Sequence, residues 1–307
     1  MTIRHFLADD DLTPEEQARV LALAAELKTA PTARQPLDGR TVAVLFDKAS
    51  TRTRISFEVG VTELGGHPMI IDASTSQMGR GEPIADTARI LDRHVAAVVW
   101  RTGAHDRITE LAEHSAVPVV NALTDDYHPC QILADLQTII EHKGNPSGLT
   151  IAYLGDGANN MANSYLLGCA TAGMHVRIGA PAGYQPAAEV VARAERIAAE
   201  TGGSVLVTDD PVAAVDGADV VTTDTWVSMG QDDESAAREA VFPPYRVTAE
   251  LMGSAAADAI VMHCLPAYRG KEIDSEVLDG PQSVIWDEAE NRRHAQKALL
   301  CFVLGAV

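Results

Sequence analysis

Residues 41–54 read TVAVLFDKASTRTR, and this stretch decides the fold class of the chain. The apolar run Thr41–Phe46 is short and is typical of a buried strand. Thr51–Leu64 then has the pattern of a helix, which ends at the pair Gly65-Gly66. A buried strand that leads directly into a helix begins a βαβ unit, so the stretch predicts a parallel sheet covered by helices.

The same alternation continues on both sides of a break at residues 144–148, GNPSG. Before the break, the sequence predicts further helices at 13–28, 84–94 and 129–142 and further strands at 95–100 and 118–121. After it, strands are expected at 149–154, 175–178, 204–207, 219–223, 259–264 and 283–286. This order predicts an α/β chain with two doubly wound parallel-sheet domains, in which ligands bind beyond the carboxyl ends of the strands.

The composition of the chain excludes several classes of protein. Its 307 residues are too many for one ordinary core, and its formal net charge of −19 argues against a nucleic-acid partner, which needs a basic face. No stretch approaches the roughly 20 apolar residues of a membrane-spanning helix. Residues 1–11 lack the apolar core of a signal peptide, so we expect a cytoplasmic protein with no membrane partner. The four cysteines have neither disulfide nor zinc-site spacing.

In the first half of the chain, basic and polar side chains gather at predicted strand ends and helix starts. Residues 47–54 place hydroxyls, guanidinium groups and free backbone N–H groups at a helix start, which suits a bound phosphate. The alternative is a serine cap with a solvated basic turn, but arginine there opposes the helix dipole unless an anion compensates it. Arg101 follows a predicted strand, and His128 and Gln131 begin the helix at 129–142. These positions predict an anion site.

Three turns in the second half carry other candidate groups. Residues 154–160, LGDGANN, resemble a dinucleotide-binding turn, but Asn160 replaces the third glycine and no clear acidic ribose partner follows. Asp224 ends the strand at 219–223, where a carboxylate suits a cationic amino acid, although an ordinary polar loop is the alternative. Cys264 lies where the strand at 259–264 ends, so it is expected at the ligand edge rather than in the core.

A set of ordered motifs covering almost the whole chain resembles the aspartate/ornithine carbamoyltransferase family. The motifs are STRTR at 50–54, WRT at 100–102, HPCQ at 128–131, DTWVSMG at 224–230, HCLP at 263–266 and ENR at 290–292. The fourth and fifth are similar to those that separate ornithine enzymes from aspartate enzymes. Aspartate enzymes characteristically offer a lysine in the loop at 74–80, whereas this chain has none between Lys48 and Lys143.

The resemblance implies a transferase that moves the carbamoyl group of carbamoyl phosphate to the side-chain amine of L-ornithine. The products are L-citrulline and phosphate, and the expected role is arginine biosynthesis. Residues 1–132 with 290–307 would bind carbamoyl phosphate, the C-terminal helix returning to this first domain, and residues 133–289 would bind ornithine. The resemblance also implies a homotrimer in which Gln77 reaches a neighbouring site. No metal or organic cofactor is expected, because the donor is already activated.

Residue by residue, the resemblance assigns two binding sets. Carbamoyl phosphate is assigned to Ser50, Thr51, Arg52, Thr53, Gln77, Arg101, His128, Gln131, Cys264, Leu265 and Arg292. Ornithine is assigned to Asn160, Asp224, Ser228 and Met229. The residues expected to act in catalysis are Arg101, His128, Asp224 and Cys264.

Three other functions compete with this interpretation. A carbamoyltransferase for another amine, such as putrescine or N-acetylornithine, differs only in the acceptor. A dinucleotide-dependent oxidoreductase would rest on Gly155 and Gly157 alone. A sensor that binds carbamoyl phosphate without turnover is disfavoured by the presence of Cys264, Asp224 and His128 together.

Overall fold

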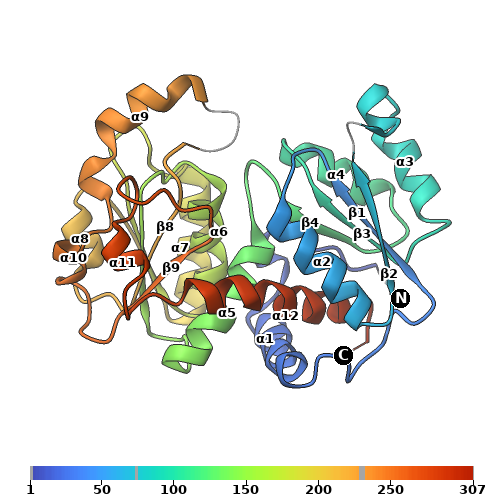
Figure 1. Cartoon of the computed structure of the whole chain (residues 1–307), viewed down its shortest axis with the longest axis horizontal. Helices are drawn as coiled ribbons and strands as arrows, with labels where there is room; N and C mark the ends of the chain where they lie inside the picture. Colours follow the sequence, from blue (N-terminus) through green and yellow to red (C-terminus); the bar gives the residue numbers. More distant parts are fainter. Residues whose placement is uncertain (1–2, 73–74, 228–231, 307) are drawn as a thin grey trace. The chain divides into compact units, whose positions relative to one another are not determined.

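The computed structural model describes residues 3–72, 75–227 and 232–306. The chain forms two compact units, the first of Met1–Gln137 with Glu290–Val307 and the second of Thr138–Ala289. Two helices, α5 (Pro129–Lys143) and α12 (Ile285–Val303), have residues in both units, as Figure 1 shows. Within the described ranges, no helix is long and apolar enough to cross a membrane.

The first unit is built on a four-stranded parallel sheet with the strand order β2-β1-β3-β4. The strands are β1 (Thr41–Phe46), β2 (His67–Asp72), β3 (Ala97–Arg101) and β4 (Val119–Leu123). Every residue of β3 is buried, and so is every residue of β1 except the first. This burial is expected for the inner strands of a parallel sheet. Phe46 pairs with Arg101, so β1 and β3 end at the same edge.

Helices cover the sheet of the first unit. They are α1 (Pro14–Thr29), α2 (Thr51–Glu63), α3 (Ile84–Leu91) and α4 (His105–His114). Residues of α3 and α4 form a core cluster with alternate residues of β1 and β3, including Leu45 and Trp100. Helix α2 packs against β1 and β2 outside this cluster. Thr13 and Glu16 cap α1 reciprocally, which fixes its start as the sequence predicts.

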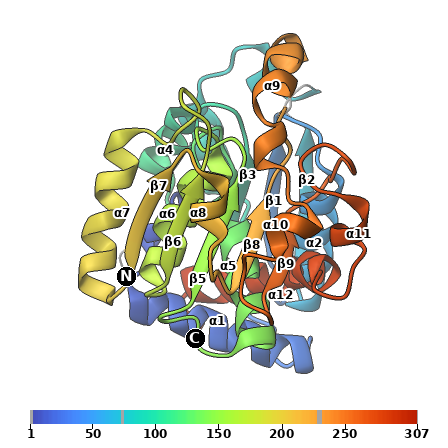
Figure 2. The same cartoon turned by 90° about the vertical axis from the view of Figure 1, so that its left-hand side faces the viewer.

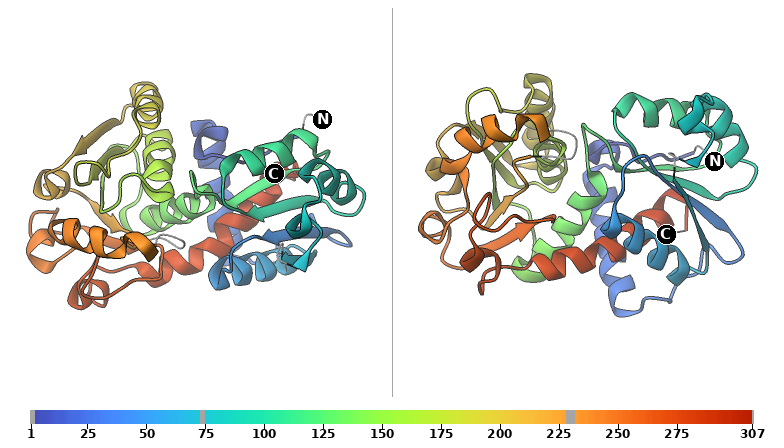
Figure 3. Two further views of the ribbon diagram at one scale, coloured as in Figure 1. Left: turned by 90° about the horizontal axis from the view of Figure 1, so that it is seen from above. Right: turned by 45° about the horizontal axis from the view of Figure 1, so that its top comes forward.

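The last helix returns to the first unit, as the family resemblance implies. The buried Lys297 of α12 donates to the carbonyl oxygens of Leu27 (3.1 Å) and Pro31 (3.2 Å) and forms an ion pair with Glu63 of α2 at 2.6 Å. Gly60 allows the close approach, because a Cβ there would lie 3.2 Å from Cγ of Lys297. Figure 3 shows the C-terminal turns of α12 alongside α1 and α2.

The second unit is built on a five-stranded parallel sheet with the order β7-β6-β5-β8-β9. The strands are β5 (Thr150–Leu154), β6 (His175–Gly179), β7 (Ser204–Thr208), β8 (Val220–Thr223) and β9 (Ile260–His263). The helices of this unit besides α5 and α12 are α6 (Asn160–Thr171), α7 (Ala188–Thr201), α8 (Pro211–Val215), α9 (Ser235–Val241), α10 (Ala249–Met252) and α11 (Ser275–Leu278). Figures 1 and 2 show α6 and α7 on one face of the sheet and α8, α10 and α11 on the other. The prediction of two doubly wound α/β halves is confirmed.

Two strand predictions differ from the structure. No strand was predicted at His67–Asp72, which forms the edge strand β2. The strand predicted at 283–286 is wrong, because Ser283 makes only an isolated bridge to Val261 and α12 begins at Ile285. Helix α12 therefore occupies the end of the stretch that was predicted as a strand.

Candidate active site

The start of α2 has the geometry of an anion cradle. Ser50 caps the helix, and its hydroxyl accepts a hydrogen bond from the backbone N–H of Thr53 at 3.4 Å. Thr51 and Arg52 are exposed, while Thr53 is buried. The first turn contains no acidic side chain, so the partial positive charge of the helix start is not compensated by the helix itself. This arrangement suits a phosphate group.

Arg101 lies at the carboxyl end of β3, next to this cradle. It is 7% exposed, and its carbonyl oxygen accepts from the backbone N–H of Asp47, the residue that follows β1, at 2.9 Å. The Asp47 carboxylate accepts in turn from Trp100 Nε1 (3.1 Å) and from the Thr102 hydroxyl, and it pairs with Arg107 at 3.2 Å. Asp47 therefore ties together the ends of β1 and β3, so that the phosphate loop and Arg101 are held in a fixed relation.

His128 is the residue on which three arginines converge. It is 6% exposed, and its pKa lies well below the usual value because of burial and then the positive charges of Arg292, Arg101 and Arg52. His128 is consequently neutral near pH 7, with one ring nitrogen as a donor and the other as an acceptor. The positive charges of three arginines thus act on one neutral imidazole in the first unit, within a chain of net charge −19.

Arg292 is oriented by a neutral side chain of α5. Its Nη1 donates to Oε1 of Gln131 at 2.5 Å, and the amide nitrogen of Gln131 donates to Oδ1 of Asp135 at 2.8 Å. Arg292 is 5% exposed and Gln131 is 1% exposed, so this contact is desolvated. The structure therefore brings Arg52, Arg101, His128, Gln131 and Arg292 into one site of the first unit, beside Ser50 and Thr53.

In the second unit, Asp224 and Cys264 lie together at the ends of β8 and β9. The Cys264 thiol donates to Oδ1 of Asp224 at 3.3 Å, and the backbone N–H of Thr225 donates to the same oxygen at 2.7 Å. Burial raises the pKa of Asp224, although the nearby His263, the Thr225 N–H and the Cys264 thiol each oppose the shift. The carboxylate is therefore more basic than an exposed one, and the thiol beside it is half-buried.

His263 supports the turn that carries Cys264. Its Nδ1 accepts from the backbone N–H of Leu265 at 2.9 Å, so the ring hydrogen is assigned to Nε2, which contacts Oε1 of the buried Glu272 at 3.2 Å. Leu265 has a φ of 60°, and the bond to Pro266 is cis. Among the described residues, Asp224, His263 and Cys264 form the one group that could hold a metal ion, with ligand atoms within 4.8 Å of one another. Both ring nitrogens of His263 are already engaged, which disfavours that use.

Comparison with known proteins identifies the family. A family model described as the carbamoyl-phosphate-binding domain of aspartate/ornithine carbamoyltransferase matches residues 4–141, and one described as the aspartate/ornithine-binding domain matches residues 147–303. The chain belongs to the aspartate/ornithine carbamoyltransferase family.

Relatives and solved structures within this family are similar over nearly their full lengths. A protein of Renibacterium salmoninarum named ornithine carbamoyltransferase is 63% identical, with 98% of both chains covered. One of Bifidobacterium longum with the same name is 62% identical, covering 99% of this chain and 96% of that protein. A solved structure titled ornithine carbamoyltransferase from Pyrococcus furiosus has a TM-score of 0.95 and 44% identity, with both chains fully covered.

In this carbamoyltransferase-family chain, the glycine-rich turn at residues 154–160 is packed against other parts of the protein. A Cβ at Gly157 would lie 2.9 Å from both the Ala180 Cβ and the Tyr184 carbonyl oxygen, so the space beside the turn is filled by protein atoms. Asp156, between the two glycines, is buried and pairs with Arg238 at 2.5 Å. These contacts give no support to a dinucleotide site. Asn160 begins α6 next to the cap residue Asn159 and is half-buried.

Three further residues of the family pattern are Gln77, Ser228 and Met229. Gln77 is exposed at the start of a short 3-10 helix, Met78–Arg80. Ser228 and Met229 lie outside the described residues. Conversely, sequence reasoning missed Glu272, for which no local signal exists, and Asp47, which lies within the quoted phosphate-loop stretch and could have been found there as the first residue after a buried strand.

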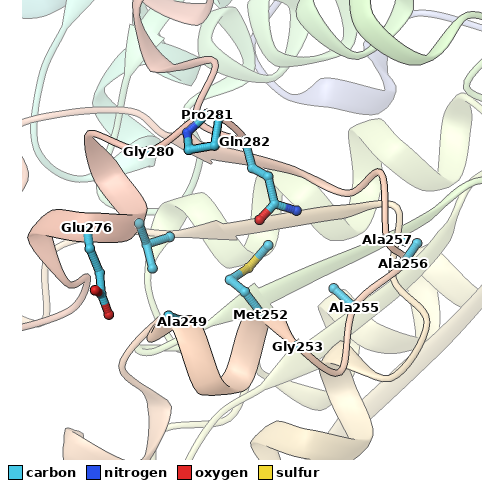
Figure 4. Close-up of a pocket in the computed structure, with 11 residues that line it drawn as sticks. Ala249, Met252, Gly253, Ala255, Ala256, Ala257, Glu276, Gly280, Pro281 and Gln282 are labelled. Atoms are coloured by element: carbon cyan, nitrogen blue, oxygen red, sulfur yellow. The ribbon is translucent and has the colours of Figure 1, made fainter.

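A separate pocket of about 400 Å³ lies in the second unit (Figure 4). It is lined by Ala249, Met252, Gly253, Ala255, Ala256, Ala257, Glu276, Val277, Gly280, Pro281 and Gln282. Figure 4 shows the side chains of Met252 and Gln282 pointing toward one another, and the Gln282 amide donates to the Ala259 carbonyl oxygen at 2.9 Å. None of these lining residues is a predicted site residue, so the pocket is distinct from the Asp224–Cys264 pair.

Proposed function

We propose that the chain is an ornithine carbamoyltransferase that converts carbamoyl phosphate and L-ornithine to L-citrulline and phosphate. The observation that carries the proposal is the anion cradle at the start of α2, together with the positive charges of Arg52, Arg101 and Arg292 that act on the buried His128. It is supported by relatives named ornithine carbamoyltransferase that are more than 60% identical over almost the whole chain. We assign residues 1–132 with 290–307 to carbamoyl-phosphate binding and residues 133–289 to ornithine binding.

The first unit would bind the dianionic donor by charge and by hydrogen bonding. The phosphate is assigned to the start of α2 from Ser50 to Thr53 and to Arg101. Arg292, His128 and Gln131 would face the carbamoyl group. As the amine attacks, negative charge develops on the carbonyl oxygen, and donors already held in place stabilise it. Loss of one such donor typically costs about 3 kcal/mol of barrier, roughly a hundredfold in rate.

The second unit would bind ornithine and manage the proton of its amine. An unperturbed amine of this kind has a pKa near 10.4, so about one molecule in 2,500 is neutral at pH 7. Asp224 is suited to the task because burial raises the pKa of its carboxyl group and so makes the carboxylate a better proton acceptor. Cys264 and Leu265 would border the carbamoyl group, and Asn160, Ser228 and Met229 would hold the α-groups.

The reaction balances with no further reactant. The amine nitrogen of ornithine attacks the carbamoyl carbon, and a carbon–nitrogen bond forms. The bond from that carbon to the phosphate oxygen breaks, phosphate leaves with the electron pair, and the amine gives up one proton. The departing phosphate carries its charge into the cluster of Arg52 and Arg101, which lowers the energy of the leaving group.

Citrulline formation by the Arg52→Ala variant tests the assignment. We expect its KM for carbamoyl phosphate to rise steeply while its KM for ornithine changes little. Arg54→Ala is the matched control, because Arg54 is exposed on the same helix and pairs with Glu58 at 3.2 Å. Unchanged carbamoyl-phosphate kinetics in Arg52→Ala would contradict the proposal, and so would equal losses in both variants.

The acceptor is tested by a panel of amines. Ornithine, putrescine and N-acetylornithine are compared at a fixed concentration of carbamoyl phosphate, and ornithine is expected to have the highest kcat/KM. Asp224→Ala should reduce kcat/KM for ornithine more than it raises the KM for carbamoyl phosphate. A higher kcat/KM with putrescine or N-acetylornithine would assign the chain to that acceptor instead.

We also propose a homotrimer in which Gln77 completes a neighbouring site. The exposed position of Gln77 supports a contribution to a neighbouring site, and the exposed apolar side chains Ile55 and Val59 of α2 support an interface on the first unit. Mixing Gln77→Ala with Arg101→Ala subunits after mild dissociation tests it. If sites are shared, the mixture regains activity above the sum of the two variants; if each chain forms its own site, it does not.

The cellular setting follows from the same proposal. The described cysteines are free and mostly buried, which is typical of a reducing compartment such as the cytoplasm. The proposed direction is citrulline formation for arginine biosynthesis. Measurement of arginine auxotrophy in cells that lack the gene tests this role.

A further inference from the structure

Arg292 has a second orienting partner besides Gln131. The Gln296 side chain lies one helical turn further along α12, and its amide is assigned with the oxygen toward Arg292, because this orientation satisfies both ends. Oε1 of Gln296 then accepts from Nη2 of Arg292 at 3.0 Å, and its nitrogen donates to the Arg292 carbonyl oxygen at 3.2 Å. Gln296 is 1% exposed, so these contacts are shielded from water.

The same amide connects Arg292 to the phosphate loop. The nitrogen of Gln296 also donates to the Ser56 hydroxyl at 2.7 Å, and that hydroxyl donates to the carbonyl oxygen of Thr53 at 3.1 Å. Ser56 and Thr53 are both buried in the first turns of α2. A continuous hydrogen-bonded path therefore runs from the guanidinium of Arg292 through Gln296 and Ser56 to the helix start that is suited to phosphate.

The chemical identity of the partners matters as much as their positions. Gln131 and Gln296 both present amide oxygens, which orient a guanidinium group without cancelling its charge. A carboxylate at either place would hold Arg292 more tightly but would neutralise it in a buried, weakly screened environment. These two amide partners thus orient Arg292 without reducing the positive charge that it offers to an anionic ligand.

We propose that Gln296 is a positioning residue of the carbamoyl-phosphate site, which holds Arg292 in register with the α2 cradle while preserving its charge. This inference rests on the proposed function. Gln296 acts through Arg292 and Ser56 and touches no substrate.

Two substitutions at position 296 separate orientation from charge. Gln296→Met removes all three hydrogen bonds of this side chain at similar volume, and loss of a hydrogen bond to a charged group should lower kcat/KM for carbamoyl phosphate about tenfold. Gln296→Glu keeps an oxygen toward Arg292 but adds a negative charge, so it should raise the KM for carbamoyl phosphate more than Gln296→Met does. The KM for ornithine should stay within about twofold in both variants, by the same reasoning.

Leu300→Val is the matched control, since Leu300 is buried on the same helix and its loss of one methylene perturbs packing alone. It should change thermal stability without changing the KM for carbamoyl phosphate. Ser56→Ala breaks the path from the side of α2 and should give a smaller loss than Gln296→Met. The double variant Gln296→Met with Ser56→Ala should be no worse than Gln296→Met, because both act on one path.

The outcomes distinguish this inference from the function on which it rests. A wild-type protein that forms no citrulline would overturn the proposed function. Wild-type turnover with an unchanged carbamoyl-phosphate KM in Gln296→Glu would overturn the role of Gln296 alone. If Gln296→Met fails to fold, the comparison of Gln296→Glu with Ser56→Ala tests the inference. A KM for carbamoyl phosphate that is lower in Gln296→Glu than in Ser56→Ala contradicts it.

Discussion

Replacement of Arg238 by methionine should destabilise the second unit more than any exposed arginine replacement. Arg238, on α9, is 5% exposed and donates from Nη1 to Oδ2 of Asp156 at 2.5 Å and to the Trp226 carbonyl oxygen at 3.0 Å. It also pairs with Glu234 at 2.9 Å, and its guanidinium lies 5.2 Å from the centre of the Tyr184 ring. One side chain therefore joins α9, the glycine turn and the segment after Asp224.

The magnitude follows from what methionine would leave behind. Asp156 is 2% exposed and would keep only the hydrogen bond from the Ala158 N–H, at 3.0 Å, among those described for its carboxylate. Breaking a buried ion pair by removing one partner costs about 3–5 kcal/mol. In a unit of this size each kcal/mol lowers the melting temperature by about 2–4 °C, so the expected decrease is roughly 6–20 °C.

Urea unfolding monitored by tryptophan fluorescence measures the loss of stability. Arg269→Met is the control, because Arg269 pairs with Asp279 at 2.7 Å but both side chains are about half exposed. An exposed pair contributes at most about 1 kcal/mol. Because Arg238 holds the Trp226 carbonyl, Arg238→Met should also raise the KM for ornithine. A loss of less than about 1 kcal/mol, or one equal to that of Arg269→Met, would refute the reasoning.

Three further predictions concern stability and pH. Lys297→Met should lower the free energy of unfolding by about 1–2 kcal/mol in urea titration, less than Arg238→Met, because Glu63 keeps Arg293 at 3.4 Å. The pKa of His128 is lowered in the folded state, so its contribution to folding stability is present above about pH 6.5 and is lost as the pH falls through the folded pKa. His128→Gln should therefore lose less stability than the wild type between pH 7 and pH 5, and an equal loss would contradict this. The pKa of Asp224 is raised in the folded state, so its contribution to folding stability is present at acid pH and is lost as the pH rises. Asp224→Asn should therefore be at least as stable as the wild type at pH 7, while its rate of citrulline formation falls. A marked drop in the melting temperature of this variant would contradict the prediction.

Sequence periodicity predicted most of the fold and failed where two signals competed. Strand β2 was missed because its short run contains Pro68, and a proline, which has no N–H to donate, is tolerated at the sheet edge that β2 occupies. Residues 283–286, SVIW, favour a strand, but the acidic first turn that follows favours a helix start, and α12 begins at Ile285. In the first place the edge position in the sheet decides the outcome, and in the second the helix start does.

The candidate site was predictable where chemistry follows position along an element. Arg101, Asp224 and Cys264 were found because parallel strands end at a common edge, and the structure places Asp224 beside Cys264. The supporting residues Glu272 and Asp47 were not predicted, because their hydrogen-bond partners come from other loops and strand ends whose positions depend on the tertiary fold. Gln296 was not predicted, because its contact with Ser56 joins residues 240 positions apart in the chain.

The discontinuity of the first unit has a consequence for synthesis of the chain. Residues 138–289 form the second unit from one uninterrupted segment, whereas the first unit requires Glu290–Val307 as well. During synthesis on the ribosome, the first unit is therefore begun first but completed last. Helices α1 and α2 cannot make their contacts with Lys297 until α12 has been synthesised. A premature stop codon that removes only residues after Ala289 should consequently leave the second unit able to fold, while the incomplete first unit is open to proteolysis.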